Sequence, residues 1–254
     1  MATIKTPGEI ERLKDGGKRL AQILKAVRAR VAPGVSAAEL NKFALHEIES
    51  RGDTASFLNY KSKGARVGFP GALCVSINDE VVHGVPHKEK IIKEGDVVSL
   101  DLGLIHEGLF TDTATTVAVG AISKEAQKLI TVTEEALAVG IKAVKEGATT
   151  GDIGAAIEKF VTPYGYGIIR ELAGHGVGYA VHEDPYIPNY GKQGEGVVLK
   201  AGMVIAIEPM LTLGGREIVL AEDKFTYKTK DTSLSAHFEH TVVVTPTGGV
   251  ILTK

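Results

Sequence analysis

The stretch "IKEGDVVSLDLG" (residues 92–103) resembles "LKAGMVIAIEPM" (residues 199–210), and this repeat is the clearest sign of how the chain folds. Each stretch has the pattern of a turn followed by a buried strand, and each carries one carboxylate, Asp101 in the first and Glu208 in the second. An ionised carboxylate among buried side chains is costly unless a cation, a bound metal ion or a raised pKa compensates it. Other segments of the sequence indicate which kind of compensation applies to Asp101.

A second repeat precedes the first. The segment "VAPGVSAAEL" (residues 31–40) resembles "VKEGATTGDI" (residues 144–153), and a long amphipathic pattern lies before each, over about residues 6–31 and 123–144. Each segment predicts that one helix ends at a glycine and that the next begins at a hydroxyl side chain. The predicted glycines are Gly34 and Gly147, and the predicted capping pairs are Ser36 with Glu39 and Thr149 with Asp152.

A third and fainter repeat relates "FTDTATTVAV" (from Phe110) to "FEHTVVV" (from Phe238), and aligning the two on their acidic residues sets Asp112 against Glu239. The three repeats follow one another in the same order: helix, helix, strand, strand. They predict an α+β protein with a single domain, residues 1–254, made of two similar halves at about 1–120 and 121–254. Each half would have two helices and a meander of antiparallel strands.

The repeats bring carboxylates together. In "DLGLIHEGLFTD" a turn near residues 106–108 predicts that Asp101 and Asp112 lie directly opposite each other on neighbouring strands. If the two halves face each other about a pseudo-twofold axis, Glu208 and Glu239 reach the same point. Four buried carboxylates cannot all stay ionised without a multivalent cation. The sequence therefore predicts a metal site.

Several histidines are candidate ligands or catalytic groups. His175 lies among glycines in "LAGHGVGYAVHEDP", which permits a close approach of the backbone to a ligand, and His182 follows it. His83 follows a short strand in "SINDEVVHGVP". Taken alone, each of these three histidines is more often a turn or surface residue without function. Strand parity places His237 on the face of Glu239 and His240 on the other face, and either could be a ligand on spacing alone.

Composition excludes several classes of protein. A net charge of −2 gives no general field that would attract nucleic acid or a membrane surface. The single cysteine, Cys74, cannot form an internal disulfide, and its position in "GALCVSIN" favours a small strand residue over a nucleophile. No signal-peptide pattern is present, and no uncharged apolar run reaches about 18 residues. We expect a soluble, cytoplasmic protein.

Five separated motifs follow one another along the chain. They are "SINDEVVHGVP", "DLGLIHEGLFTDTATT", "GHGVGYAVHEDP", "IEPM" and "TKDTSLSAHFEHTVVV". From about Thr6 to the C-terminus the chain resembles the type I methionine aminopeptidases. The resemblance implies the pita-bread fold, a pseudo-twofold-symmetric architecture in which helices pack on the outer face of a curved antiparallel sheet. The absence of a long insertion between His175 and Glu208 argues against the type II enzymes.

The same resemblance implies the roles of the site residues. The implied ligands of a dinuclear site are Asp101, Asp112, His175, Glu208 and Glu239. Among them, Asp112 and Glu239 would bridge both metal ions, and Glu208 would also act as general base. His83 and His182 would contact the substrate and serve catalysis. The ligand chemistry suits Co, Mn, Fe(II) or Zn, and the sequence does not choose among these ions.

The resemblance also implies a pocket for a methionine side chain. Tyr60 and Cys74 match residues that line this pocket in the family. At four further pocket positions, relatives often carry other residues: Phe57, Phe69, Val181 and Phe225. All four are apolar here, so a thioether should still fit.

The implied activity is hydrolytic removal of the initiator methionine from new chains whose second residue is small. Two rival interpretations stay open: a proline dipeptidase, a class that usually carries a further N-terminal domain, and a peptide-binding protein without activity. The expected partners are the N-terminal methionine of nascent polypeptides and, transiently, the ribosome. We expect no specificity for nucleic acid, no membrane association and a monomer.

Overall fold

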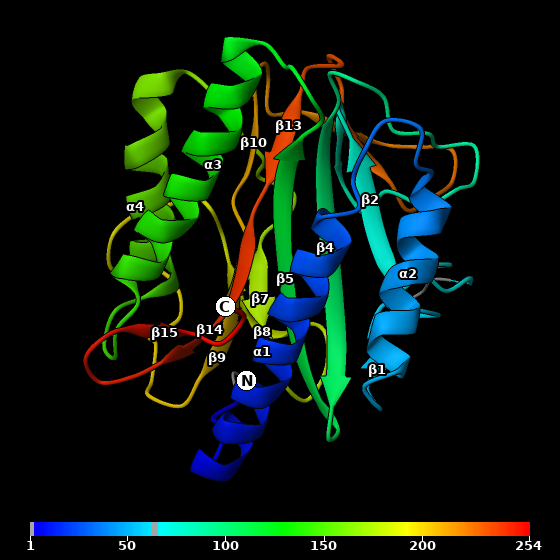
Figure 1. Ribbon diagram of the computed structural model, residues 1–254. Helices are drawn as coiled ribbons and strands as arrows, with labels where there is room; N and C mark the ends of the chain where they lie inside the picture. Colours follow the sequence, from blue (N-terminus) through cyan, green and yellow to red (C-terminus); the bar gives the residue numbers. More distant parts are fainter. Residues whose placement is uncertain (1–2, 62–65) are drawn as a thin grey trace.

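The computed structural model describes residues 3–61 and 66–254, and Figure 1 shows its layout. In this part of the chain the helices are α1 (Pro7–Arg28), α2 (Ala37–Glu49), α3 (Lys124–Ala143), α4 (Thr150–Val161) and the short 3-10 helix η1 (Thr162–Tyr164). The strands of the first half are β1 (Thr54–Ala55), β2 (Leu73–Ile77), β3 (Glu80–Val82), β4 (Val97–His106) and β5 (Leu109–Ala118). The strands of the second half are β6 (Gly167–Ile168), β7 (Gly174–Gly176), β8 (Glu183–Ile187), β9 (Val204–Ile207), β10 (Met210–Thr212), β11 (Ile218–Leu220), β12 (Tyr227–Thr229), β13 (Ser235–His237), β14 (Glu239–Val244) and β15 (Gly249–Ile251).

Side-chain caps begin the helices as the sequence predicts. Thr6, Ser36 and Thr149 each accept a hydrogen bond from the backbone N–H three residues later, and the acidic side chain there accepts the N–H of the cap in return. At the start of α3, Ser123 accepts the N–H of Ala126. These bonds satisfy N–H groups that the first turn of a helix leaves unpaired. The predicted helix starts are confirmed.

The predicted helix ends at Gly34 and Gly147 are wrong. Both α1 and α3 end several residues earlier, and the two glycines lie in the turns that follow, with φ of 90° and 82°. There Gly34 N donates to Ile92 O at 2.9 Å, and Gly147 N donates to Leu199 O at 2.9 Å. Because the left-handed backbone region favours glycine, the residue type reflects this turn and not a helix cap. The equivalent contact in each half supports the repeat.

The main sheet joins the two halves. Within the described residues, nine strands form one antiparallel sheet in the order β1–β4–β5–β14–β9–β7–β8, with β2 paired to β4 and β15 paired to β14. The halves meet in the middle of this order, where β5 pairs with β14. On either side of this boundary lie the two strands that the first repeat matches, β4 next to β5 and β9 next to β14. The sheet therefore has the pseudo-twofold arrangement that the sequence predicts.

Helices cover both halves of the sheet. In Figure 1, α1 and α2 (blue) lie beside β2, β4 and β5, and α3 and α4 (green) lie beside the strands of the second half. Leu20 and Leu100 belong to the core of the first half, and Leu129 and Ile205 to the core of the second. Burial of each such side chain contributes roughly 1.5–3 kcal/mol. Since side chains alternate along a strand and Leu100 faces the helices, Asp101 points to the opposite face.

The predicted register of the β4–β5 hairpin is wrong by two residues. Asp101 pairs with Ala114, and Asp112 pairs with Gly103, so the two carboxylates are diagonal neighbours and not directly opposite. The reason is the turn, in which His106 pairs with Leu109 and only two residues form the loop. Both loop residues have positive φ, 47° and 78°, as a tight type I′ turn requires. A shift of two keeps both carboxylates on the same face.

Among the described residues, no helix is long and apolar enough to cross a membrane.

Candidate metal centre and substrate pocket

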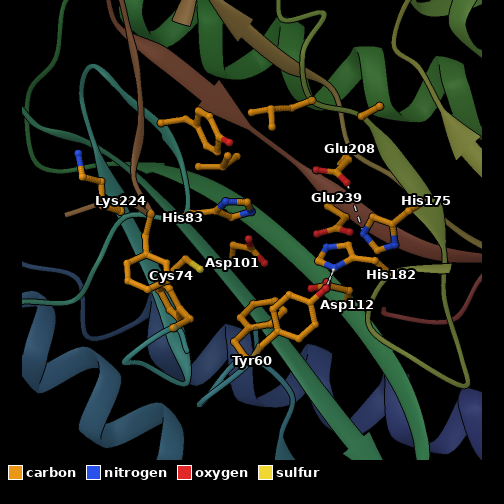
Figure 2. A pocket seen from close by; sticks show the side chains of 17 residues that line it. Tyr60, Cys74, His83, Asp101, Asp112, His175, His182, Glu208, Lys224 and Glu239 are labelled. Atoms are coloured by element: carbon orange, nitrogen blue, oxygen red, sulfur yellow. Dashed lines mark hydrogen bonds and ion pairs between the residues drawn. The ribbon is translucent and has the colours of Figure 1, made fainter. Parts of the chain in front are cut away.

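A pocket of about 290 Å³ lies on the sheet face opposite the helices, and the predicted site residues other than Val181 line it (Figure 2). Its charged and polar lining comes from both halves of the chain: Asp101, Asp112, His83, His175, His182, Glu208 and Glu239. Its apolar lining includes Phe57, Phe69, Cys74 and Phe225. In Figure 2 the carboxylates of Asp112, Glu208 and Glu239 cluster on one side with the imidazoles of His175 and His182. Cys74 lies toward the other side, and Asp101 lies between them.

Strand pairing explains why the carboxylates converge. On β5, Ala114 pairs with Asp101 of β4 on one side and with Glu239 of β14 on the other. Paired residues share a face, so both carboxylates flank the small side chain of Ala114. Asp112, two residues earlier on β5, points the same way. Glu208 follows β9, the strand next to β14, and completes the group.

The cluster has the properties of a cation site. Ligand atoms of Asp112, His175 and Glu239 lie within 4.8 Å of one another. Buried oxygens with no hydrogen-bond partner among residues 3–61 and 66–254 include Asp101 Oδ1, Asp112 Oδ1 and Glu239 Oε1. Carboxylate oxygens that are buried and unpaired are costly, and a divalent ion would satisfy them. The residues present therefore fit a metal centre.

Burial and mutual repulsion disfavour the charged carboxylates without a cation. Burial raises the pKa of Glu208 to about 8 and that of Asp101 to about 6. The pKa values of Asp112 and Glu239 are also raised well above their usual range, first by burial and then by neighbouring carboxylates. Such shifts are typical of functional clusters of like charge.

The ring of His175 is oriented for ligation. Its Nδ1–H donates to Gly176 O at 2.9 Å, which leaves Nε2 free to face the cluster, 3.5 Å from Glu208 Oε1. A backbone acceptor on one ring nitrogen fixes the tautomer and orientation of a ligand histidine. The glycine that follows is required, because a Cβ on Gly176 would lie 2.1 Å from Asp184 O.

The structure shows which of the two histidines near Glu239, His237 or His240, lies beside the cluster. His237 is buried beside the cluster, with Nε2 3.4 Å from Glu208 Oε2. His240 points away, and its Nδ1 shares a hydrogen bond of 2.9 Å with Thr253 Oγ1. His237 is therefore a neighbour of the candidate centre, and His240 is part of the packing on the other face.

His182 and His83 border the pocket from different loops. His182 Nδ1 shares a hydrogen bond of 2.7 Å with Tyr60 Oη, and its ring centroid lies 4.4 Å from that of His175. His83 has a positive φ of 57°, and its carbonyl accepts a bond of 3.3 Å from Thr226 Oγ1. Burial lowers the pKa of His83 to about 4, so its imidazole is neutral near pH 7.

An apolar chamber adjoins the cluster. Phe57, Phe69, Cys74, Val85 and Val181 form one buried group, and the partly buried Tyr60, Phe110 and Phe225 pack against it. Phe69 and Phe225 meet edge to face, with ring centroids 5.6 Å apart. Burial and the nearby carboxylates raise the pKa of the Cys74 thiol, which is the opposite of what a nucleophile needs.

Sequence reasoning missed part of the wall. Five further residues line the pocket: Val82, Leu172, Ala173, Lys224 and Tyr227. Tyr227 reaches it because β12 pairs with β3, where Tyr227 lies opposite Val82. No local signal predicts this contact, because about 145 residues of chain separate the two strands. A contact between such distant segments leaves no periodic pattern in the sequence.

Residues 11–246 match metallopeptidase family M24, and the chain belongs to this family. A metallopeptidase uses divalent metal ions, in agreement with the buried cluster. The predicted pita-bread fold is confirmed by solved structures of related enzymes. An Xaa-Pro dipeptidase from Bacillus anthracis shares it, with a TM-score of 0.79 at 25% identity, and this chain covers 62% of that protein.

The closer likeness is to methionine aminopeptidases. The chain is 49% identical to the methionine aminopeptidase of Aquifex aeolicus over 97% of this chain and 96% of that protein. It is 40% identical to that of Escherichia coli, over 99% and 93% of the two proteins. The solved methionine aminopeptidase of Thermotoga maritima superimposes with a TM-score of 0.95 at 45% identity, and both chains are covered completely.

Proposed function

We propose that this protein is a methionine aminopeptidase that removes the initiator methionine from new polypeptides whose second residue is small. The observation that carries the proposal is that the carboxylate–histidine cluster and the apolar chamber line one pocket. The cluster can hold metal ions, and the chamber can hold one unbranched side chain. An N-terminal methionine is the substrate that uses both.

The ligand set proposed for two divalent ions is Asp101, Asp112, His175, Glu208 and Glu239. Asp112 and Glu239 would be the ligands shared by the ions, as the family resemblance implies, and both reach the centre from adjoining strands with unpaired oxygens. When bound, such ions lower the pKa of a coordinated water, polarise a carbonyl and offer a position to the free α-amino group of the substrate. Mostly carboxylate ligands suit Co, Mn, Fe(II) or Zn.

The protein groups supply the proton transfers and the orientation. Glu208 would accept the proton of the attacking water, because its carboxylate faces the centre, 3.5 Å from Nε2 of His175. His182 would donate a hydrogen bond to the developing oxyanion through Nε2, since Tyr60 engages its Nδ1. His83, neutral near pH 7, would hydrogen-bond the scissile amide nitrogen.

The methionine side chain would lie among Tyr60, Cys74, Phe57, Phe69, Val181 and Phe225. Residues 1–254 would act as a single catalytic domain and as a monomer in the cytoplasm. Because the substrate is the exposed N-terminus of a nascent chain, transient association with the ribosome would be an advantage.

The test is peptide cleavage by metal-reconstituted protein. We expect release of free methionine from Met-Ala-Ser and no cleavage of Ala-Pro. Cleavage of Ala-Pro alone would favour a proline dipeptidase. A protein that binds no divalent ion and leaves both peptides intact would refute the proposal and favour a peptide-binding role.

A further inference from the structure

A buried ion pair lies directly behind His182. Lys5 Nζ is 2.8 Å from Glu183 Oε2, and the exposed fractions of the two side chains are 0% and 11%. Glu183 is the residue after His182 at the start of β8. Lysine is almost never fully buried unless it is paired, so this contact is a specific feature of the fold.

The carboxylate of Glu183 closes the loop that carries His182. Its Oε1 accepts the backbone N–H groups of Tyr179 and, at 3.0 Å, Ala180. Its Oε2 accepts Lys5 Nζ and the hydroxyl of Thr3. Burial alone would raise the pKa of Glu183, but the hydrogen bonds from Lys5, Thr3 and Ala180 lower it below its usual range. Glu183 is therefore ionised, and both of its carboxylate oxygens accept hydrogen bonds that hold the loop.

The segment before α1 packs against this loop. Lys5 N donates to Gly202 O at 2.8 Å, and Lys5 Nζ lies 4.6 Å from the ring centroid of Tyr179. The fit at Gly178 leaves no space, since a Cβ there would lie 2.3 Å from Lys5 Cε. On the other side of the loop, Gly178 O accepts a hydrogen bond of 2.8 Å from the backbone N–H of Phe110, near the start of β5. The loop is thus held between the N-terminal segment and the main sheet.

We propose that Lys5 and Glu183 are positioning residues that set the place of His182 in the reaction. This inference rests on the proposed function. The loop supplies the imidazole of His182 to the pocket lining and the buried side chain of Val181 to the adjoining apolar chamber. On the pocket side, the contacts of His182 with described residues include a hydrogen bond and a ring contact with Tyr60 and a ring contact with His175. The Lys5–Glu183 ion pair fixes the opposite side of the same peptide segment. It thereby holds Nε2 of His182 in a constant orientation toward the substrate.

Loss of the ion pair should affect turnover more than substrate binding. Removal of either charge leaves its partner buried without compensation, and the loop then relaxes toward solvent. A displacement of about 1 Å at a catalytic group lowers turnover by about 10- to 100-fold. Bound metal should not change, because neither Lys5 nor Glu183 belongs to the proposed ligand set. KM should stay within about twofold, as expected when only a transition-state contact is weakened.

The experiment compares Lys5→Met, Glu183→Gln and the double variant with the wild type. Kinetic constants for Met-Ala-Ser and metal content are measured, together with hydrogen exchange of residues 177–184. We expect lower kcat, unchanged metal content, faster exchange in this segment and a double variant no worse than the worse single variant. Glu183→Gln keeps the shape of the side chain, so it tests the inference even if Lys5→Met does not fold.

Asp53→Asn is the matched control. Asp53 is also a buried carboxylate, 2.7 Å from His106 Nδ1 and 3.6 Å from Arg19 Nη1, at a place outside the pocket lining. It should lose stability and keep the kcat of the wild type. If Glu183→Gln keeps wild-type kcat, or if exchange of residues 177–184 does not change, the positioning role is refuted. If the wild type releases no methionine, the proposed function fails instead, and the exchange comparison still decides whether the ion pair holds the loop.

Discussion

Acid should destabilise the metal-free protein in part through His83. Burial lowers the pKa of this imidazole from 6.5 to about 4, and His182 and His237 add to the effect. A group whose pKa is lowered by folding stabilises the fold fully when the pH is above its unfolded value. This stabilisation is lost as the pH falls from about 6.5 toward about 4, because the unfolded chain takes up the proton first.

The magnitude follows from the two pKa values. They differ by about 2.5 pH units, and each unit corresponds to about 1.4 kcal/mol. The contribution is therefore at most about 3 kcal/mol, since the ring borders the pocket and water there screens part of the charge. This is a large share of the stability of a typical domain, about 5–15 kcal/mol.

The assay is urea unfolding of the wild type and of His83→Asn between pH 7 and pH 4. Asparagine does not titrate, and it tolerates the positive φ of 57° at this position better than most residues. We expect the wild type to lose up to about 3 kcal/mol more than the variant over this range. The acid response of His240 is common to both proteins and cancels, and that of His175 cancels except for the contribution of a charged His83. Parallel curves would refute the argument, because His83 would then take up its proton without cost.

Four further changes test the site and its support. Asp112→Asn should lower hydrolysis at least about 100-fold together with metal content, and full activity would contradict its bridging role. His182→Ala should lower kcat about 100-fold at unchanged metal content, whereas a loss confined to metal would contradict the role in the oxyanion site. Phe225→Ala should raise KM for methionyl peptides about tenfold with little change in kcat, and an unchanged KM would place the thioether elsewhere. In Gly103→Ala the added Cβ would lie 2.0 Å from Ser56 Oγ. The free energy of unfolding in urea should then fall by about 1–3 kcal/mol, and an unchanged value would show that Ser56 moves aside freely.

The helices were predictable because their signals are local. A cap and the residue that it bonds lie three positions apart, so the capping pairs of α1, α2 and α4 can be read directly from the printed sequence. The helix ends were less predictable. A glycine with positive φ fits a helix cap and a later turn equally well, and only the contact with Ile92 or Leu199 distinguishes the two.

The hairpin register shows a similar limit. Moving the turn of β4 and β5 by one residue changes the pairing by two, and a change of two preserves which side chains share a face. The sequence could therefore predict that Asp101 and Asp112 face the same side. It could not distinguish opposite from diagonal neighbours, because the alternating pattern is identical in both.

The sequence by itself determined which side chains are acidic, that they recur at matching points of two repeated halves, and that burial requires a compensating cation. Only the tertiary structure decided whether His237 or His240 lies beside Glu208, which residues of β3 and β12 close the pocket, and that Lys5 contacts the loop of His182. The physical reason is range. Periodicity and caps act within a few residues, whereas these contacts join segments up to about 180 residues apart. Shape and charge select such contacts only once the sheet has brought the segments together.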